Sequence, residues 1–393
     1  MNDWPRASIR SGCAMGNPPG GAPRHILTGE YPPMPGGVSD YTLLLARALS
    51  AAGEAVVVWT PPACDGSVCA PGVEVRRLPD HFGSRSRAVM EQAIARGAKV
   101  LLQYVPHAFG CRTMNLPLAS WLWRRRRWWA IDVMFHEVAM PFGLDQPVLY
   151  NIPATVQRVM ARMLVRASRR VFVSTESWRS LVEGGGRRAI VTPVFSNLPP
   201  AESAEVDAVR RQLPAGKVVG HFGNCGPWMI DFLCEALEPL LTRQPGAVVQ
   251  FIGRGSSRGG EAVRQRLGGL ADRLMVSGGL SPERAAAHVA ACDVMLLPYP
   301  DGITTRRSSA MAALSAGVPV VTTTGHLTEA FWSAVEGVRS GRGPVQCATL
   351  VESVLADDPY RGRLSAAARM LYAEQFDILH TVRRLREADA AES

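Results

Sequence analysis

The sequence lacks the features by which export and membrane spanning are usually recognised. No apolar run reaches the ~18 residues that a membrane-crossing helix needs. The N-terminal stretch holds Arg6 and Arg10 among Gly and Pro, without the apolar core of a signal peptide. We therefore expect a cytoplasmic protein.

The sequence also gives little indication of disulfide bonds or of a metal site. The eight cysteines form no C-x-x-C pair, and no cysteine or histidine cluster has zinc spacing. A chain of 393 residues does not need disulfides to fold. We expect free thiols and no metal site, with a reactive thiol at Cys225, beside a glycine-rich turn, as the less favoured alternative.

Lysine is almost absent, since only Lys99 and Lys217 occur, so the positive charge is carried by arginine. Residues 1–200 hold 23 Lys and Arg against 13 Asp and Glu, and residues 201–393 hold 20 against 21, so the net +9 divides into +10 and −1. This asymmetry indicates an anionic partner for the first half. The 47% hydrophobic and 20% charged residues exclude a disordered chain.

The order of apolar runs predicts two α/β domains. Buried strands are expected at 25–28, 55–60, 100–105, 131–135 and 171–174, with helices at 41–52, 87–96 and 154–167. After a polar segment at 197–216, strands are expected at 218–222, 248–252, 274–276, 294–298 and 318–322, with helices at 229–241, 261–270, 282–291, 306–316 and 327–335. Such alternation is typical of doubly wound parallel sheets.

The expected organisation follows from this pattern. Residues 1–23 form a loose extension, 24–200 one Rossmann-like domain and 215–358 a second, and the helical tail at 359–393 could cross back to the first. Ligands of open α/β sheets sit beyond the carboxyl ends of the strands, so the loops that follow strands are the candidate site, expected in a cleft between the two domains.

Three of these loops are rich in glycine. In the first, Gly36 and Gly37 precede a helix that Ser39 or Asp40 could cap; this is either an anion site or a simple strand-to-helix turn. The other two are the loop with Gly223 and Asn224 and the fragment Gly-Arg254-Gly, which lacks the rest of a dinucleotide fingerprint.

The fourth loop, after residue 298, combines hydroxyls and guanidiniums at the start of an Ala-rich helix. A helix start presents free N–H groups and a positive dipole end, and arginine forks match phosphate oxygens. We interpret the loop as a diphosphate site, with a capped helix and solvated arginines as the alternative. Its candidate residues are Asp301, Gly302, Thr304, Thr305, Arg306, Arg307 and Ser308.

The motifs at 31–41, 48–53 and 313–323 resemble those of the retaining glycosyltransferases of family 4, over nearly the whole chain from residue 25. The resemblance implies the GT-B fold, in which two Rossmann-like domains face each other across a cleft. It also implies transfer of a sugar, as by a hexosyltransferase, from a nucleotide sugar with retention, without a metal or other cofactor. The C-terminal domain would bind this donor and the N-terminal domain the acceptor, which could be a glycan, a lipid-linked or a small molecule.

The same resemblance assigns individual residues. His136 resembles the family's histidine near the reacting sugar, with a buried structural role as the alternative. Glu137 beside it is a candidate to orient the acceptor, with a surface carboxylate as the alternative. Two family glutamates are replaced by Thr304 and Ala312, which leaves Asp301 as the nearest carboxylate. The family's phosphate-binding cations are also missing near Asn224 and Met229, and neighbouring arginines would have to replace them.

A further segment, at 121–129, alternates indoles with four arginines. Tryptophan and arginine suit an anionic membrane interface, so we expect contact with the inner face of a membrane, the alternative being a solvated Arg face with inward Trp residues. No nucleic-acid module is recognisable. The expected contact residues are Trp121, Arg124, Arg125, Arg126, Arg127 and Trp128.

Rival functions remain open at this point. The missing glutamates are consistent with a non-catalytic partner subunit. A nucleotide-sugar epimerase shares the two-domain fold, and a nicotinamide oxidoreductase is weaker because no complete G-x-G-x-x-G follows a strand. The placement of carboxylates typical of glycosidases is not readable, so a hydrolase is not supported.

Overall fold

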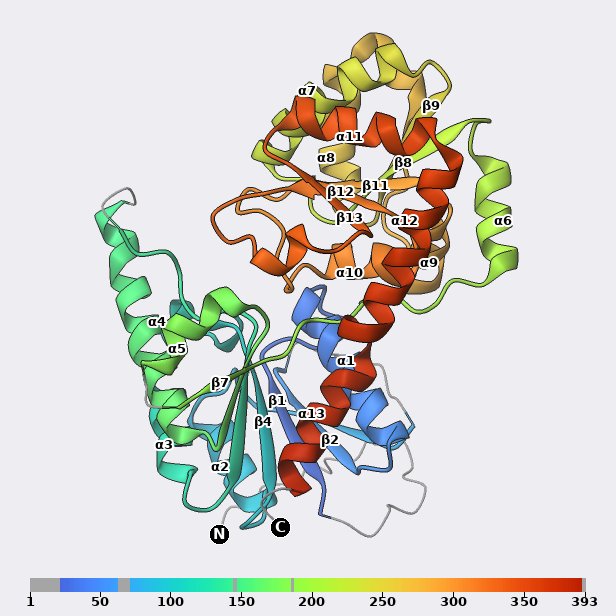
Figure 1. Ribbon diagram of the computed structural model, residues 1–393. Coiled ribbons are helices and arrows are strands. Elements are labelled where there is room, and N and C mark those ends of the chain that lie inside the picture. The colour runs from blue at the N-terminus through green and yellow to red at the C-terminus, as the bar shows by residue number, and fades with distance from the viewer. Residues whose placement is uncertain (1–21, 63–70, 144–146, 185–186, 391–393) are drawn as a thin grey trace, which may run out of the picture. The chain divides into compact units, whose positions relative to one another are not determined.

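A computed structural model describes residues 22–62, 71–143, 147–184 and 187–390. The chain divides into two compact units (Figure 1). Unit 1 comprises Met1–Ser174, Trp178–Thr192 and Arg384–Ser393, and unit 2 comprises Thr175–Ser177 and Pro193–Arg383.

Unit 1 is built on a parallel sheet of seven strands in the order β3-β2-β1-β4-β5-β6-β7. The central strands are buried along nearly their whole length and carry mainly apolar residues, as expected of a sheet covered on both faces. The strands are β1 (Arg24–Thr28), β2 (Val56–Thr60), β3 (Val73–Arg77), β4 (Lys99–Tyr104), β5 (Ala130–Phe135), β6 (Arg170–Val173) and β7 (Ala189–Val191).

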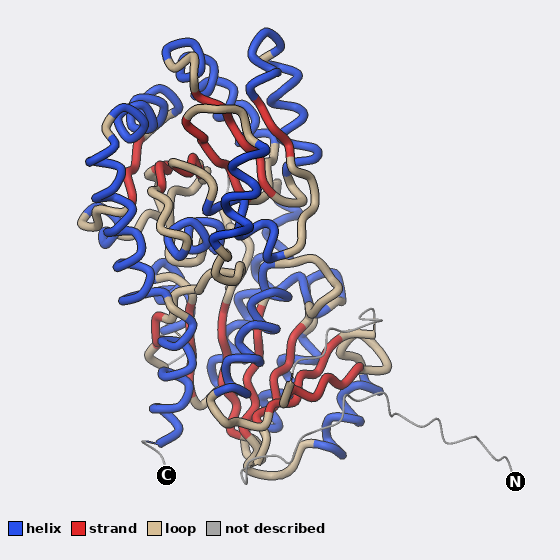
Figure 2. The backbone as a smooth tube through the Cα atoms, turned by 90° about the vertical axis from the view of Figure 1, so that its right-hand side faces the viewer, coloured by secondary structure: helices blue, strands red, loops and turns tan. Residues whose placement is uncertain are grey.

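The helices of unit 1 pack on both faces of this sheet (Figure 2). They are α1 (Gly37–Ala51), α2 (Ser84–Ala93), α3 (Leu116–Arg125), α4 (Val148–Ala167) and α5 (Arg179–Glu183), with 3-10 turns at Pro106–Phe109 and Cys111–Thr113; a third turn, Glu176–Trp178, lies where the chain briefly joins unit 2. The end of the last helix, α13 (Ile378–Ala390), belongs to this unit: Arg386 lies 3.6 Å from Glu54, and Arg170 donates to the carbonyl of Leu385.

Unit 2 repeats this plan with six parallel strands in the order β10-β9-β8-β11-β12-β13. The strands are β8 (Lys217–Phe222), β9 (Ala247–Ile252), β10 (Leu274–Val276), β11 (Val294–Leu297), β12 (Val320–Thr323) and β13 (Val338–Gly341). The α-helices are α6 (Ser203–Gln212), α7 (Pro227–Arg243), α8 (Ser256–Arg266), α9 (Pro282–Ala290), α10 (Ser308–Ser315), α11 (Pro344–Ala356) and α12 (Asp358–Leu371). Shorter turns lie at Gly268–Arg273, Ala330–Ser333 and Tyr372–Phe376.

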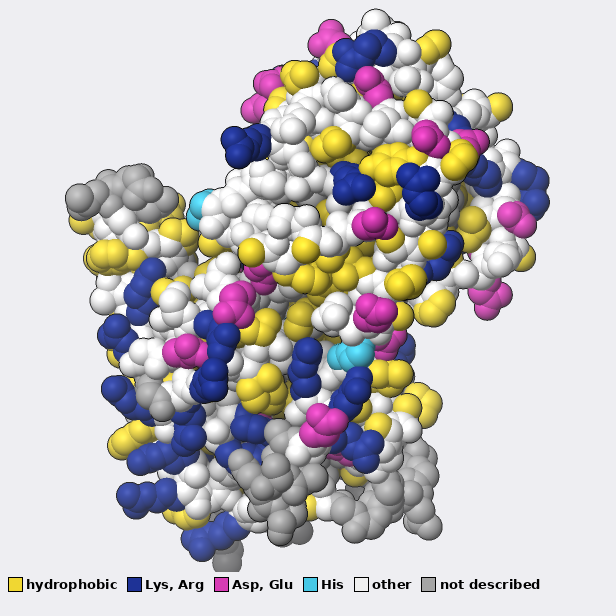
Figure 3. Space-filling view, viewed as in Figure 1, with side chains coloured by type: hydrophobic (Ala, Val, Ile, Leu, Met, Phe, Trp, Pro, Cys, Tyr) yellow, Lys and Arg dark blue, Asp and Glu magenta, His cyan; other side chains and the backbone are white. Residues whose placement is uncertain are grey.

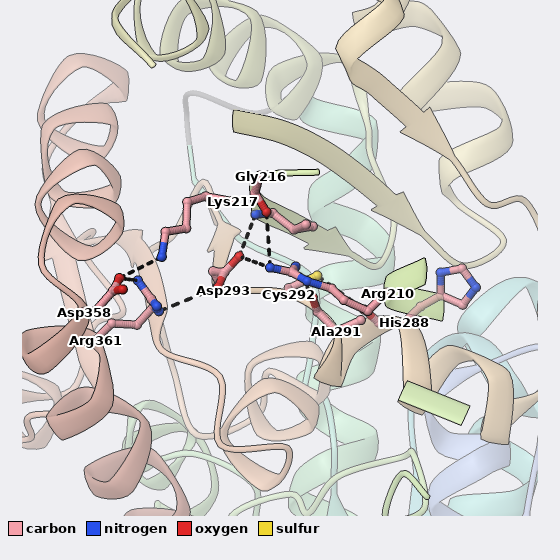
Figure 4. A network of polar contacts seen from close by, with 10 residues as sticks. Arg210, Gly216, Lys217, His288, Ala291, Cys292, Asp293, Asp358 and Arg361 are labelled. Atoms are coloured by element: carbon pink, nitrogen blue, oxygen red, sulfur yellow. Dashed lines mark hydrogen bonds and ion pairs between the residues drawn. The ribbon is translucent and has the colours of Figure 1, made fainter. Parts of the chain in front are cut away.

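A charged network closes the amino end of the second sheet (Figure 4). Asp293 accepts a hydrogen bond from the Val218 backbone at 2.7 Å and one from Arg210 at 2.9 Å, and Arg361 lies 3.6 Å away. Because Arg210 is on α6 and Arg361 on α12, one carboxylate ties two helices to the start of β8. This edge of the sheet is therefore fixed, and the opposite edge carries the candidate loops.

Some expected elements differ from the observed ones. The expected linker at 197–216 contains α6, whose Val209 is buried against α9. The helix expected at 327–335 is wrong, since only the 3-10 turn Ala330–Ser333 forms there. The helix after Gly36 starts at Gly37, without the expected side-chain cap from Ser39 or Asp40.

Candidate functional site

Three loops of unit 2 meet at the carboxyl edge of its sheet, because β9, β8 and β11 are neighbours. The glycine loop after β8 touches the other two. A Cβ at Gly255 would lie 2.8 Å from Asn224 Cα, and one at Gly223 would lie 3.7 Å from Ser309. Glycine at 255 therefore allows the β9 loop to close on the β8 loop, and Gly223 brings the latter against the start of α10.

Two arginines precede α10 in this cluster. Arg307 lies 3.4 Å from Asp301 and Arg306 lies 3.8 Å from the same carboxylate, and both side chains are 19% exposed. The Arg307 guanidinium also stacks over Tyr299 at 4.5 Å, whose hydroxyl bonds to Ser309 at 2.8 Å. Positive charge is thus held at the N-terminus of α10, which starts at Ser308 without a side-chain cap.

Glu329 organises the approach to α10 and is a residue that sequence reasoning missed. Its carboxylate accepts hydrogen bonds from the backbone N–H and the hydroxyl of Thr305, both at 2.7 Å. It also accepts from the Thr175 hydroxyl at 2.7 Å, the Glu176 backbone at 3.0 Å and the Trp332 indole at 3.0 Å. One carboxylate therefore fixes the backbone that leads into the arginines.

The other predicted donor-binding residues of unit 2 have mixed environments. Asn224 and Arg254 are exposed, whereas Gly302, Thr304 and Thr305 are buried. Gly302 has a φ of 87°, and a Cβ there would overlap Thr328 and the Gly325 backbone, so close packing alone requires glycine. The Thr304 hydroxyl, completely buried, has no hydrogen-bond partner within the described chain.

Cys225 follows Asn224 in the glycine loop. Burial raises the pKa of its thiol to about 11. The thiol is therefore protonated at neutral pH, and the structure does not favour the reactive alternative.

His136 follows β5 in unit 1 and is almost fully buried. Its Nε2 lies 2.7 Å from the Gln103 side-chain oxygen, and its ring meets the Tyr41 ring edge-on at 4.6 Å. Burial lowers the pKa of His136 to about 3, so the imidazole is neutral at ordinary pH. A neutral imidazole held by the Gln103 amide is consistent with a structural role for His136 as much as with contact to a sugar.

Glu137 belongs to a more exposed cluster at the carboxyl edge of the first sheet. His107 lies between two carboxylates, with Nε2 at 3.4 Å from Glu30 and Nδ1 at 3.7 Å from Glu137. Glu30 follows β1, His107 follows β4 and Glu137 follows β5, so three neighbouring strands supply the cluster. The hydrogen bond to Glu30, followed by the charges of both carboxylates, raises the pKa of His107 despite partial burial.

Gly36 and Gly37 lie at the start of α1, beside this cluster. The carboxylate of Glu30 occupies the space that a Cβ at Gly36 would need, whereas Gly37 faces open space within 4 Å. Gly36 thus leaves room for the Glu30 carboxylate. Because this carboxylate is negatively charged and would repel a bound anion, the structure does not favour the anion site predicted at Gly36. Sequence reasoning did not single out Glu30 or His107, although both follow predicted strands.

In the segment 121–129, rich in tryptophan and arginine, some indoles are buried and others are exposed. Trp121 is 4% exposed and donates its indole N–H to Glu91, so its expected membrane contact is wrong. Trp123 and Trp128 are 40% and 39% exposed, and Arg126 and Arg125 stack on them at 4.1 Å and 4.5 Å. In the described parts of the chain, no helix is long and apolar enough to cross a membrane.

The described residues contain no group of three or more His, Cys, Asp or Glu side chains that could hold a metal ion. The two candidate clusters thus offer cations and amides in unit 2, and carboxylates with a histidine in unit 1.

Comparison with protein families gives two matches. Residues 36–198 match the "Glycosyl transferase 4-like domain" and residues 216–357 match "Glycosyl transferases group 1", which together span most of both units. No curated protein sequence matches the chain at a significant level.

Solved structures are similar over almost the full length. Sucrose-phosphate synthase from Thermosynechococcus elongatus has a TM-score of 0.69 at 17% identity, covering 94% of this chain and 100% of that one. HepE of Anabaena, in complex with UDP and glucose, has a TM-score of 0.65 at 19% identity, covering 94% and 100%. WaaG, a glycosyltransferase involved in lipopolysaccharide biosynthesis, has a TM-score of 0.64 at 15% identity, covering 92% of this chain and 98% of that one. At these identities the similarity establishes the shared GT-B fold.

Proposed function

The chain belongs to the group 1 glycosyltransferases of family 4, and from that premise we propose that it transfers a hexose from a nucleoside-diphosphate sugar to an acceptor hydroxyl with retention and without a metal. The Anabaena relative was solved with UDP-glucose, which makes this the first donor to test. A retaining mechanism is named for trehalose-6-phosphate synthase, another structural neighbour.

The observation that carries the proposal is the placement of Arg306 and Arg307 at the start of α10, beside the glycine loop at Gly223. In the reaction, the bond between the anomeric carbon and the diphosphate oxygen breaks, and the acceptor oxygen bonds to that carbon on the same face. The acceptor proton passes to the departing diphosphate. Guanidiniums and backbone N–H groups stabilise the negative charge that grows on the leaving group.

The missing family glutamates leave the donor sugar without its expected carboxylates. Thr304 and Ala312, which occupy those positions, are buried. Asp301 is 37% exposed but is paired with both arginines, which orients their guanidiniums as well as neutralising part of their charge. Because of this loss, a non-catalytic partner that binds the nucleotide without turnover remains the second candidate.

We assign acceptor recognition to the cluster of Glu30, His107 and Glu137. Carboxylates accept hydrogen bonds from sugar hydroxyls, and a protonated imidazole donates them. The side chains of His107 and Glu137 are 57% and 46% exposed, so they can reach an acceptor. His136, buried behind Tyr41, would position this edge of the sheet.

Release of UDP from UDP-glucose, with and without a panel of acceptor sugars, tests the proposal. We expect slow release by hydrolysis even without an acceptor, and an α-linked product when an acceptor is used, which NMR of the anomeric proton identifies. The variant Arg306→Gln/Arg307→Gln should release UDP at least ~30-fold more slowly, because two charge-assisted contacts to the diphosphate are lost.

The outcomes separate the candidates. Binding of UDP-glucose without release of UDP under any condition would identify the partner subunit. Conversion of UDP-glucose into an isomer would identify the epimerase. Failure to bind any nucleotide sugar would exclude the transferase, the nucleotide-binding partner subunit and the epimerase alike.

A further inference from the structure

The outer face of α4 in unit 1 is apolar in its first half and exposed. Val148, Ile152 and Val159 are 79%, 58% and 41% exposed and lie on one face at helical spacing. Leu149 and Tyr150, in the first turn, are 77% and 52% exposed. Hydrophobic side chains gather at this end of α4 on the left of Figure 3.

The same face becomes basic along the helix. Its row of exposed positions runs from Val148 through Ile152, Thr155 and Val159 to Arg162 and Arg166. Neither α4 nor its neighbour α3 contains a single Asp or Glu. Exposed Arg124 lies in the last turn of α3 and exposed Arg127 just after the helix, and basic side chains line this edge of the unit in Figure 3.

We propose that α4 docks unit 1 onto an anionic lipid bilayer, with its apolar half at the level of the headgroups and its arginines on lipid phosphates. Exposed Val, Leu and Ile gain free energy when they leave water, and each basic residue near an anionic bilayer adds to binding. The exposed Trp123 and Trp128 of the neighbouring segment suit the same interface. The docking surface therefore centres on α4, which the composition of the 121–129 segment did not reveal.

A lipid surface fits this face better than other occupants do. Pairing of two copies through α4 would place Arg162 and Arg166 against apolar residues or against each other, because neither α3 nor α4 offers a carboxylate to neutralise them. A nucleic acid would pair with the arginines but would leave Val148, Leu149 and Ile152 in water. Anionic lipid satisfies both halves of the face at once.

Co-sedimentation of the full chain with vesicles tests the docking surface. We expect binding to vesicles that contain phosphatidylglycerol and much weaker binding to phosphatidylcholine alone. Leu149→Glu/Ile152→Glu should weaken binding roughly tenfold or more, and the uncharged Leu149→Ser/Ile152→Ser should also weaken it, because insertion of these side chains is lost. Arg162→Gln/Arg166→Gln should weaken binding by a similar factor.

Val345→Glu/Met370→Glu is the matched control, since these two side chains of unit 2 are also exposed, at 67% and 61%, and should be without effect. An unchanged far-UV circular dichroism spectrum and thermal transition of every variant show that the fold is intact, so vesicle binding is tested independently of the transferase assignment. The inference is overturned if the full chain does not bind anionic vesicles. It is equally overturned if the Leu149 and Ile152 variants bind as well as the parent, or if they convert a dimer into monomers in sedimentation velocity.

Discussion

Replacing Glu329 with glutamine tests whether a single carboxylate holds the loop that leads into α10. One oxygen accepts from the Thr305 backbone at 2.7 Å and the Trp332 indole at 3.0 Å, which can only donate. The other accepts from two hydroxyls, of Thr175 and Thr305, and from the Glu176 N–H. A glutamine amide cannot satisfy both sets, because its NH₂ must face at least one N–H donor.

The magnitude follows from this count of donors. Glutamine would turn its NH₂ toward the two hydroxyls, which can rotate to accept, and leave the exposed Glu176 N–H to water. The bonds to Thr305 and Trp332 would then have a neutral instead of a charged acceptor, which should lower the free energy of unfolding by about 1–2 kcal/mol. Alanine removes every acceptor, and we expect a loss of about 3–4 kcal/mol. Urea unfolding of the full chain measures both free energies, and UDP binding should weaken in the same order.

Glu336→Gln is the matched control, because Glu336 is exposed and follows in the same loop region. Equal unfolding free energies for the Glu329 and Glu336 glutamine variants would refute the reasoning. So would an alanine variant that binds UDP as tightly as the parent, since the loop would then hold its conformation without the carboxylate.

Three more expectations concern single positions. Asp293→Asn should lower the unfolding free energy by about 2 kcal/mol in urea titrations, because a charged acceptor at the edge of the second sheet is lost. His107 has a raised pKa when folded, so its stabilising contribution is fully present below the ordinary histidine pKa of 6.5 and is lost as pH rises through the raised folded-state pKa. The melting-temperature gap between the parent and His107→Gln should therefore close in alkaline buffer; a gap that widens there would contradict the contact with Glu30. Gly302→Ala should cost about 2 kcal/mol or more, whereas Gly343→Ala, with open space around it, should be nearly neutral in the same thermal scan.

The central strands of both sheets were predictable, because a strand buried on both faces is a continuous apolar run. Runs such as 218–222 and 248–252 coincide closely with β8 and β9. The strands that sequence reasoning missed, β3, β7 and β13, all lie at sheet edges. β3 and β13 are partly exposed and carry polar residues, as in Val-Glu-Val-Arg-Arg of β3, so their pattern does not differ from that of a loop, and β7 has only three residues.

The wrong helix at 327–335 has a tertiary cause. Its apolar spacing is helical, but the Leu327 N–H donates to the Asp301 carbonyl and Glu329 binds Thr305. The backbone at Glu329, beside these contacts, is extended (ψ 140°), so a continuous helix is interrupted there. Local periodicity does not report such partners, which lie more than twenty residues away in the chain.

The candidate site was predictable only in part, for a related reason. The rule that ligands lie after parallel strands identified the loops at Gly223, Arg254 and Arg306, which the sheet order brings to one edge. Glu30 and His107 obey the same rule and could have been found with it. Glu329 could not, because its importance comes entirely from the five hydrogen bonds that the folded chain directs to it.

Isothermal titration of the full chain with UDP and other nucleoside diphosphates tests the central claim most directly, that arginines and amides at the start of α10 receive a diphosphate. We expect saturable binding, weakened at least ~30-fold in Arg306→Gln/Arg307→Gln and unchanged in Arg243→Gln, an arginine of the same unit that pairs with Glu352. Binding of equal strength in the double variant, or no uptake of any nucleoside diphosphate by the parent chain, would contradict the account.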